Sequence, residues 1–299
     1  MFGPAGHSQL ASPGVSQTAV DDLIKLLDLE SIEVNLFRGN SPEEDRQRVF
    51  GGQVAGQALV AAARTLEDES LGLHSLHAYF LRPGDPSVPI VYEVDRIRDG
   101  RSFTTRRVVA IQHGQAIFNL SASYQVPEEG LEHAFEMPDA PDPETLPDRR
   151  ERLAPFADQL GDLLDRPQAI DTRIADWSVD DRSRSLPPYQ RVWLRADGKL
   201  PDDPLLHTIV LTYASDMTLL DTALLPHAGT WFNPSLFMAS LDHAMWFHRP
   251  FRADEWLLYS QDTPTASSGR GLARGLVYTQ GGLLVASVVQ EGLIRVARS

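Results

Sequence analysis

The sequence predicts an α+β protein in which two antiparallel sheets are each wrapped around a central buried helix. Three observations predict it. Two long segments, 51–66 and 205–225, are almost entirely apolar. Each is followed by a run of segments with the alternating polarity of strands, joined by short turns. A helix that is apolar on most faces must be covered, and a curled antiparallel sheet can cover it.

The third observation is a segment that occurs twice. Residues 77–83 read His-Ala-Tyr-Phe-Leu-Arg-Pro, and residues 243–250 read His-Ala-Met-Trp-Phe-His-Arg-Pro. Each copy is followed by strand patterns, and the last strand of each ends in a glutamine, Gln125 or Gln290. Two copies indicate two similar folding units in one chain, an arrangement called a double hot-dog.

The first unit is expected over residues 19–128, after a flexible tail over residues 1–18. The tail is rich in Gly, Pro, Ser and Ala, a composition that does not support a packed core. Apolar spacing of three and four residues predicts helices, and alternation predicts strands. In this unit the predicted helices cover 20–28 and 51–66, and the predicted strands cover 31–39, 73–82, 88–98, 101–112 and 115–126.

Residues 129–187 are expected to be a linker between the units. The segment is acidic and rich in proline, as in Met-Pro-Asp-Ala-Pro-Asp-Pro-Glu, with a short helix near 147–164. The second unit follows over residues 188–299. Its predicted elements are a strand over 189–195, a helix over 205–225, and strands over 236–248, 255–265, 270–279 and 282–295.

Composition excludes several classes of protein. The 299 residues carry a net charge of −14, which argues against nucleic acid as a partner. There is no cysteine, so disulfides, thiolate zinc sites and cysteine nucleophiles are excluded. No apolar run approaches the roughly 20 residues that a membrane span needs, and no secretory signal is recognisable. We therefore expect no stable membrane insertion and a cytoplasmic location.

Common catalytic signatures are missing, among them Gly-x-Ser-x-Gly, Ser-x-x-Lys, His-Glu-x-x-His and the P-loop. The glycines of 269–275 precede no helix, so they do not indicate a dinucleotide site, and we expect no cofactor and no metal. Ser240, Asp242 and His243 do not suggest a local triad, because alternation on a strand turns His243 away from the other two. His243 is interpreted as a structural histidine, since His77 holds its place in the repeat.

Five residues are candidates for chemistry. Asp216 lies in an apolar helix, where a carboxylate is costly unless it is hydrogen-bonded in a core network or functional. Ser240 begins a strand that would cover this helix, and it is either bonded to backbone or part of a site. Gln290 closes an apolar strand, as an ordinary strand end or as a positioning group. Gly51–Gly52 open the first helix, where they permit close packing or present a backbone N–H to an oxyanion.

These residues resemble the acyl-CoA thioesterase II family, the TesB-like double hot-dog thioesterases. The resemblance covers about residues 30–295 and leaves out the tail and the segment around 130–190. The matching stretches are Phe-Arg-Gly-Asn (37–40), Arg-Val-Phe-Gly-Gly-Gln-Val-Ala-Gly-Gln-Ala-Leu (48–59), His-Ser-Leu-His-Ala-Tyr-Phe-Leu-Arg-Pro-Gly (74–84), Arg-Asp-Gly-Arg-Ser-Phe-x-x-Arg-Arg-Val (98–108), Tyr-Ala-Ser-Asp (213–216), Ser-Leu-Asp-His-Ala-Met-Trp-Phe-His-Arg-Pro-Phe (240–251), Glu-Trp-Leu-Leu-Tyr (255–259) and Val-Gln-Glu-Gly (289–292).

The resemblance implies hydrolysis of a fatty acyl-CoA to free fatty acid and coenzyme A. In that family the catalytic group is an Asp, a Ser or Thr, and a Gln, which match Asp216, Ser240 and Gln290. Asp216 would activate a water that Ser240 and Gln290 hold, and the Gly51–Gly52 backbone would stabilise the oxyanion. The resemblance also implies a homo-oligomer, with a tetramer favoured. The chain ends in Val-Ala-Arg-Ser rather than in the peroxisomal Ser-Lys-Leu.

Differences between the two units indicate where the site lies. Gly51–Gly52 occur in the first unit, whereas Asp216 and Ser240 occur in the second. At the matching places the first unit has apolar residues, Leu59–Ala61 and Leu73, and the two units share the glutamine. We therefore expect one composite site per chain and a degenerate twin.

Two other functions remain open. A hot-dog enoyl-CoA hydratase or dehydratase would use an Asp-His or Glu-His pair in an Asp-x-Asn-x-x-His pattern, which does not occur here. A non-catalytic acyl-CoA-binding protein would keep the pocket and lose the acid. Coenzyme A phosphates could be contacted by several arginines, although any one of them is more often solvated: Arg101, Arg106, Arg107, Arg270 and Arg274.

Overall fold

The computed structural model describes residues 14–42, 47–68, 70–161, 164, 166–178, 181, 183–228 and 235–296. The α-helices are α1 (Gly14–Leu27), α2 (Gly51–Ala63), α3 (Arg149–Leu153), α4 (Ala157–Leu160) and α5 (Pro204–Ser215), and the 3-10 segments are η1 (Pro143–Thr145), η2 (Ala154–Phe156) and η5 (Leu220–His227). The strands are β1 (Glu30–Glu33), β2 (Leu36–Gly39), β3 (Gly72–Phe80), β4 (Ile90–Asp99), β5 (Phe103–Gln112), β6 (Gln115–Gln125), β7 (Ile170–Ile174), β8 (Tyr189–Ala196), β9 (Leu236–Ser240), β10 (Asp242–Phe247), β11 (Leu257–Ser267), β12 (Arg270–Thr279) and β13 (Leu284–Val296).

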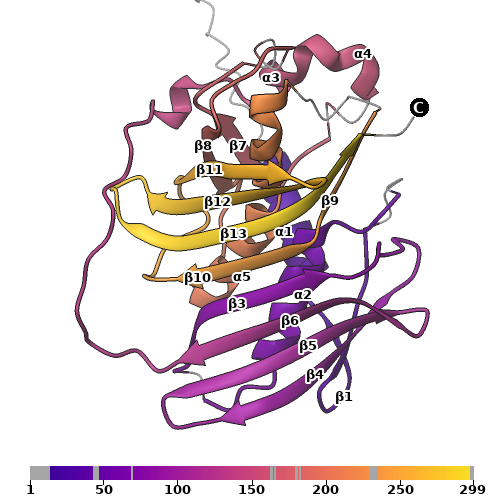
Figure 1. Ribbon diagram of the computed structural model, residues 1–299. Helices are drawn as coiled ribbons and strands as arrows, with labels where there is room; N and C mark the ends of the chain where they lie inside the picture. Colours follow the sequence, from indigo (N-terminus) through magenta and orange to yellow (C-terminus); the bar gives the residue numbers. More distant parts are fainter. Residues whose placement is uncertain are drawn as a thin grey trace, which may run out of the picture.

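The strands form one continuous antiparallel sheet in the order β1-β2-β4-β5-β6-β3-β10-β13-β12-β11-β8-β7, with β9 also paired to β13. The α+β prediction is confirmed. Where the sequence predicts two sheets, however, β3 and β10 join them edge to edge, with Ala244 opposite His77 (Figure 1). The reason is that an unpaired strand edge exposes backbone N–H and C=O groups, and each half satisfies the edge of the other.

Helices α2 and α5 lie side by side against one face of this sheet (Figure 1). They run antiparallel, because Gly52 lies against Tyr213 and Gly56 lies against Ile209. Leu27 of α1 covers the outer side of Gly56. The apolar composition of both helices therefore has a direct cause, since each is enclosed by the sheet and by its neighbouring helices.

The predicted strand over 31–39 is instead the hairpin β1–β2. Asn35 turns the chain with φ of 64°, in the left-handed region that Asn tolerates better than most residues. Alternation continues through the turn, which is why the sequence pattern shows a single strand.

The expected linker over 129–187 contains a strand. β7 lies inside it and pairs with β8 at the edge of the sheet, with buried Ile170, Thr172 and Ile174 facing inward. The helix expected over 147–164 is broken into α3, η2 and α4, and residues 162 and 163 lie outside the described residues. Proline and glycine interrupt the helical pattern there.

The first part of the linker also packs on the second unit. The Trp193 indole donates to the Pro141 carbonyl at 2.9 Å, and the Trp256 indole donates to Glu144 at 2.9 Å. Two buried indoles thus fix a segment that its composition marks as a loop.

Of the expected tail, residues 1–13 lie outside the described residues, and residues 14–18 begin α1. In the parts of the chain that the structure describes, no helix is long and apolar enough to span a bilayer.

Candidate active site

Asp216 lies at the C-terminal end of α5. The predicted helix over 205–225 divides there into α5 and η5, and Asp216 is the C-cap residue with φ of −81° and ψ of −7°. The helix begins at Pro204, preceded by Asp203, whose side chain accepts from the Leu205 N–H. The carboxylate is therefore at a helix end and not, as the sequence suggested, within the helix.

The structure brings the three predicted side chains together. Gln290 Nε2 donates to Asp216 Oδ1 at 2.6 Å, and Ser240 Oγ donates to the same oxygen at 3.2 Å. Gln290 Nε2 also lies 3.1 Å from Ser240 Oγ, which closes a triangle. Residues from α5, β9 and β13 thus meet at one carboxylate oxygen.

A β-bulge gives Ser240 its direction. Ser240 lies opposite Gly292, and Ala244 lies opposite Val289, so the three residues 241–243 span the length of two residues on β13. The extra residue reverses the alternation, as bulges do. The expectation that Ser240 and His243 face opposite sides is therefore wrong, since both contact α5.

The glycine pair at the start of α2 touches this site from the first unit. A Cβ at Gly51 would lie 2.7 Å from Asp216 Oδ2, and a Cβ at Gly52 would lie 2.3 Å from the Tyr213 carbonyl oxygen. Residues without a side chain are needed for so close an approach of two helices. The N-terminus of α2 therefore meets the C-terminus of α5.

The Gly52 N–H has a different partner from the predicted one, because it donates to the Asp216 carboxylate. While it does so, it is not available to an oxyanion. Gly51 is the other member of the pair, and its N–H belongs to the first turn, whose N–H groups have no partner within the helix.

Burial raises the pKa of Asp216 to about 6, from an ordinary value of 3.8. Hydrogen bonds from Gln290, Ser240 and Gly52 act in the opposite direction and lower this pKa. Asp216 is therefore ionised near neutral pH, yet it is a stronger base than an exposed aspartate.

The Gln290 side chain has one polar atom that neither Asp216 nor Ser240 engages. The side chain is fully buried, and its Oε1 has no hydrogen-bond partner among the residues that the structure describes. Because an ionised carboxylate only accepts, Nε2 must face Asp216, and this leaves Oε1 as a free acceptor. A buried acceptor without a partner costs free energy.

A buried pair that the sequence interpretation missed lies beside this triangle. Ser215 Oγ and His243 Nε2 are 2.8 Å apart, and both residues are almost fully buried. Asp242, the third member of the rejected triad, accepts from the Glu291 N–H at 2.6 Å. The signal in the sequence was a histidine in a strand of apolar residues, which the repeat had explained as structural.

Comparisons with known proteins identify the family of the chain. A family profile described as acyl-CoA thioesterase matches residues 169–293, and one described as the acyl-CoA thioesterase N-terminal domain matches residues 41–125. The human protein acyl-coenzyme A thioesterase 8 is 41% identical over 285 residues, covering 91% of this chain and 88% of its own. The chain belongs to the acyl-CoA thioesterase family. Acyl-CoA thioesterase 2 of Haemophilus influenzae is 40% identical and covers 92% of this thioesterase and 98% of its own chain.

A solved structure shares the fold of the thioesterase. The acyl-CoA thioesterase II TesB2 of Mycobacterium marinum superposes with a TM-score of 0.76 at 48% identity, over 92% of this chain and 98% of its own. The double hot-dog architecture is thereby confirmed, and the enzyme hydrolyses acyl-CoA thioesters.

The repeated Arg-Pro segment of this thioesterase is scaffold. Arg82 Nη1 donates to the Ala116 carbonyl at 2.6 Å, and Arg249 Nη1 donates to the Leu284 carbonyl at 3.1 Å. Ala116 and Leu284 lie near the starts of β6 and β13, the last strands of the two units. Each arginine thus links the segment after its own strand, β3 or β10, to the strand that pairs with it, β6 or β13.

The strand pairing also corrects the alignment of the two copies. Phe80 of β3 lies opposite Phe118, and Phe247 of β10 lies opposite Ala286. Phe118 and Ala286 therefore correspond, and four residues farther along each strand Ala122 corresponds to Gln290. The prediction that the copies share the glutamine is therefore wrong, and Gln125 belongs to another position.

The same register removes the equivalence of the two histidines. His243 corresponds to Leu76, because Phe247 and Phe80 correspond, and both residues are buried. His77 is exposed and stacks edge-on against Trp246, with ring centroids 5.2 Å apart.

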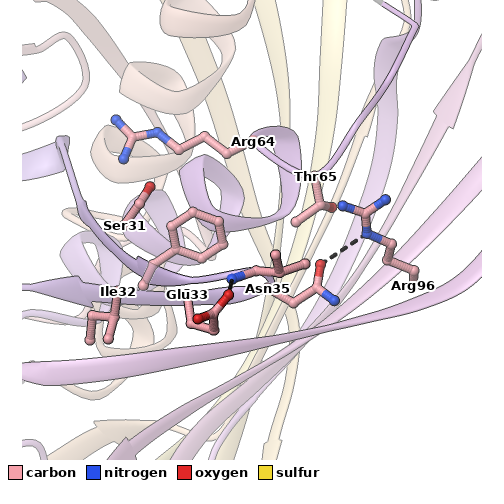
Figure 2. Close-up of a pocket in the computed structure, with 9 residues that line it drawn as sticks. Ser31, Ile32, Glu33, Asn35, Arg64, Thr65 and Arg96 are labelled. Carbon is pink, nitrogen blue, oxygen red and sulfur yellow. Dashed lines mark hydrogen bonds between the residues drawn. The ribbon is translucent and has the colours of Figure 1, made fainter.

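A hollow of about 490 Å³ lies at the C-terminal end of α2, beside the β1–β2 hairpin (Figure 2). Arg64 and Thr65 of the helix end line it, whereas the predicted Leu59–Ala61 do not. Its carboxylate, Glu33, is exposed and accepts from the adjacent Val34 N–H at 2.8 Å. Leu73 and Ala122, the counterparts of Ser240 and Gln290, do not line it either, so this hollow is not the counterpart of the Asp216 site.

Proposed function

We propose that Asp216, Ser240 and Gln290 activate a water molecule that hydrolyses the thioester of a fatty acyl-CoA. The observation that carries this proposal is the 2.6 Å contact of Gln290 Nε2 with a carboxylate whose pKa burial raises to about 6. Such a carboxylate is ionised at the working pH and still basic enough to take a proton.

The step balances without a covalent intermediate. Asp216 takes a proton from the water, and the water oxygen forms a bond to the thioester carbon. The carbon–sulfur bond of the tetrahedral intermediate then breaks, and the proton on Asp216 passes to the departing sulfur. The products are the free acid and coenzyme A, and Asp216 is ionised again.

Ser240 and Gln290 would hold the reactants of this step. Their donor groups fix one oxygen of Asp216, so that its other oxygen can face the water. We assign the oxyanion donor to the Gly51 N–H at the N-terminus of α2, where partial positive charge favours an anion.

Substitution of Asp216 by Asn tests the proposal. General-base catalysis is worth about 10²- to 10⁴-fold, so kcat should fall by that range while the fold persists. The assay is release of coenzyme A thiol from acyl-CoAs of C2 to C18, with circular dichroism of each variant. Asp262→Asn is the matched control, because Asp262 pairs with Arg274 at the surface.

Unchanged turnover in Asp216→Asn would refute the assignment. Loss of a double bond without free thiol would indicate the hydratase reading, and binding without turnover would indicate an acyl-CoA-binding protein. The profile over chain length would also define the acyl group.

We further propose a homo-oligomer, with a tetramer favoured, in the cytoplasm. Both follow from the resemblance and from sequence features. Light scattering on the purified protein and fractionation of cells test them separately, and a monomer or an organellar pool would contradict them.

A further inference from the structure

We propose that Ser215 and His243 form a buried positioning pair that fixes the last turn of α5 and so holds Asp216 in place for water activation. The inference rests on the proposed function, because it assigns the pair a role through Asp216. Neither residue touches the reacting atoms in this scheme, so both are positioning residues.

The hydrogen bonds define how the pair acts. Ser215 Oγ lies 2.9 Å from the Thr212 carbonyl oxygen and 2.8 Å from His243 Nε2. A hydroxyl has one proton, and the carbonyl can only accept, so the serine donates to Thr212 and His243 Nε2–H donates to the serine. The pair thus secures a carbonyl in the last turn of α5, where carbonyls lack partners within the helix.

The bulge in the covering strand lets one short segment hold two consecutive helix residues. Ser240 contacts Asp216, and His243 contacts Ser215. Without the extra residue between them, the two side chains would point to opposite faces of the sheet. This segment therefore attaches the α5 end at two points, one at the carboxylate and one at the preceding residue.

Packing alone does not call for a histidine at this position. The corresponding residue of the first unit is Leu76, which is fully buried and needs no hydrogen bond. His243 is equally buried, and within the described part of the chain its Nδ1 has no hydrogen-bond partner. A buried polar atom without a partner costs free energy, which the second unit tolerates at the place that adjoins Asp216.

His243 positions without exchanging protons. Burial lowers its pKa to about 4, so the ring is neutral at working pH. Titratable groups around the α5 end include Tyr213 of α5 itself, His243 of β10, Tyr259 of β11 and Asp216, and burial raises the pKa of Tyr259 well above its usual range. Asp242 is engaged by the Glu291 N–H.

The decisive variant is His243→Leu, which installs the residue of the first unit. Because a misplaced catalytic group can cost about 100-fold, we expect kcat to fall by about 10- to 100-fold, with KM changed by less than about threefold. The thermal midpoint should not fall, since leucine fits the corresponding position and leaves no orphaned nitrogen. Wild-type kcat in this variant would overturn the proposal.

Two further variants show whether the pair acts as a unit. Ser215→Ala should lower kcat to a similar extent, and the double variant should lose no more than either single variant. His243→Gln keeps an N–H donor within reach of Ser215 and should recover most of the activity. Additive losses, or no rescue by glutamine, would contradict the pair.

The pH profile separates positioning from simple loss of folded enzyme. Burial raises the pKa of Asp216, and hydrogen bonds from Gln290 and Ser240 lower it, so a displaced Asp216 should move the acid limb of kcat/KM away from about pH 6. A smaller folded fraction would scale the whole profile and leave the limb in place, which would overturn the inference.

A second pair provides the matched control. His248 Nε2 lies 2.8 Å from Ser287 Oγ, the same contact in an exposed setting on the same chain segment. His248→Leu should keep the wild-type kcat. Asp216→Asn in the same assay distinguishes the two proposals: if it stays active, the proposed function fails, whereas an inactive Asp216→Asn beside a fully active His243→Leu refutes this inference alone.

Discussion

The central helices of the two units end in opposite charges. The C-cap of α5 is Asp216, whereas the C-cap of α2 is Arg64. Beside the end of α2, buried Arg106 donates to the hydroxyl and the carbonyl of Thr65, at 2.7 and 3.1 Å. A helix C-terminus carries partial negative charge and favours a cation. The cation at the end of α2 therefore stabilises the first helix, whereas the carboxylate at the end of α5 does not stabilise the second.

The second unit depends on the first to keep its carboxylate. The Gly52 N–H at the start of α2 donates to Asp216 and lowers its pKa, against burial. Because the two helices are antiparallel, the positive end of one meets the anion at the end of the other. In the proposed mechanism, one unit thus supplies the base and the other supplies its electrostatic partner.

After Asp216→Asn, the largest effect is expected from Gln290→Ala, which installs the residue of the matching position, Ala122. Loss of one preorganised donor typically costs about 10²- to 10³-fold in kcat, and we expect that range. Thiol-release kinetics measure it. Gln125→Ala is the control, because the strand register gives Gln125 no such place. Equal losses of kcat in both variants would show that Gln125 and Gln290 have equivalent roles, contrary to the strand register.

The pH dependence should show the second largest effect. The base must be ionised, and burial raises the pKa of Asp216 to about 6. With one ionisation near that value, kcat/KM should rise about 100-fold from pH 4 to pH 8 and level off above pH 7. Steady-state rates over this interval, with far-UV circular dichroism at each pH, provide the check. An acid limb centred near 4 would show that the site does not perturb Asp216.

The third effect is on stability. Between pH 3.8 and about 6 the native Asp216 binds a proton more tightly than the unfolded chain does, so its ionisation destabilises the fold as pH rises through this window. Asp216→Asn should therefore be more stable than wild type by up to about 3 kcal/mol above pH 6, and should gain nothing at pH 4. Urea unfolding at both pH values tests this. A gain of equal size at both would exclude ionisation as its cause.

The smallest effect should come from Arg106→Met in the first unit. The substitution leaves the Thr65 carbonyl without its donor and should cost about 1–3 kcal/mol of stability. The activity should not change, because Arg106 supports the helix end that has no catalytic role. Reduced kcat in a variant of unchanged stability would show that the C-terminal end of α2 influences the Asp216 site at the other end of that helix. The sequence interpretation of Arg106 as a coenzyme A contact would then need to be reopened.

Much of the fold could be predicted because strand alternation and apolar helices leave clear patterns. The failures have physical causes. Asn35 turns the chain without interrupting the alternation, and β7 is too short to stand out within an acidic linker. The bulge at residues 241–243 is set by pairing with β13, which local sequence does not reveal.

The sequence indicated candidate residues where a polar side chain stood out in an apolar setting, as with Asp216 and Gln290, and the structure brings these two together. The sequence could not give the Gly52 N–H its partner, because that partner lies on the other unit. It also matched His243 with His77 instead of Leu76, because the two copies of the repeat differ by one residue in length before Arg-Pro. Correct equivalence required the register of β3 and β10 with their neighbours.

The seam between β3 and β10 has a consequence for how such a molecule can change. Two separate, identical half-chains joined along the same seam would obey twofold symmetry, and every substitution would appear at both helix ends. A covalently continuous chain is free of that constraint. Residues 64 and 216 can then change independently. The end of α2 can carry the stabilising Arg64, while the end of α5 keeps the unfavourable charge of Asp216 that the proposed mechanism requires.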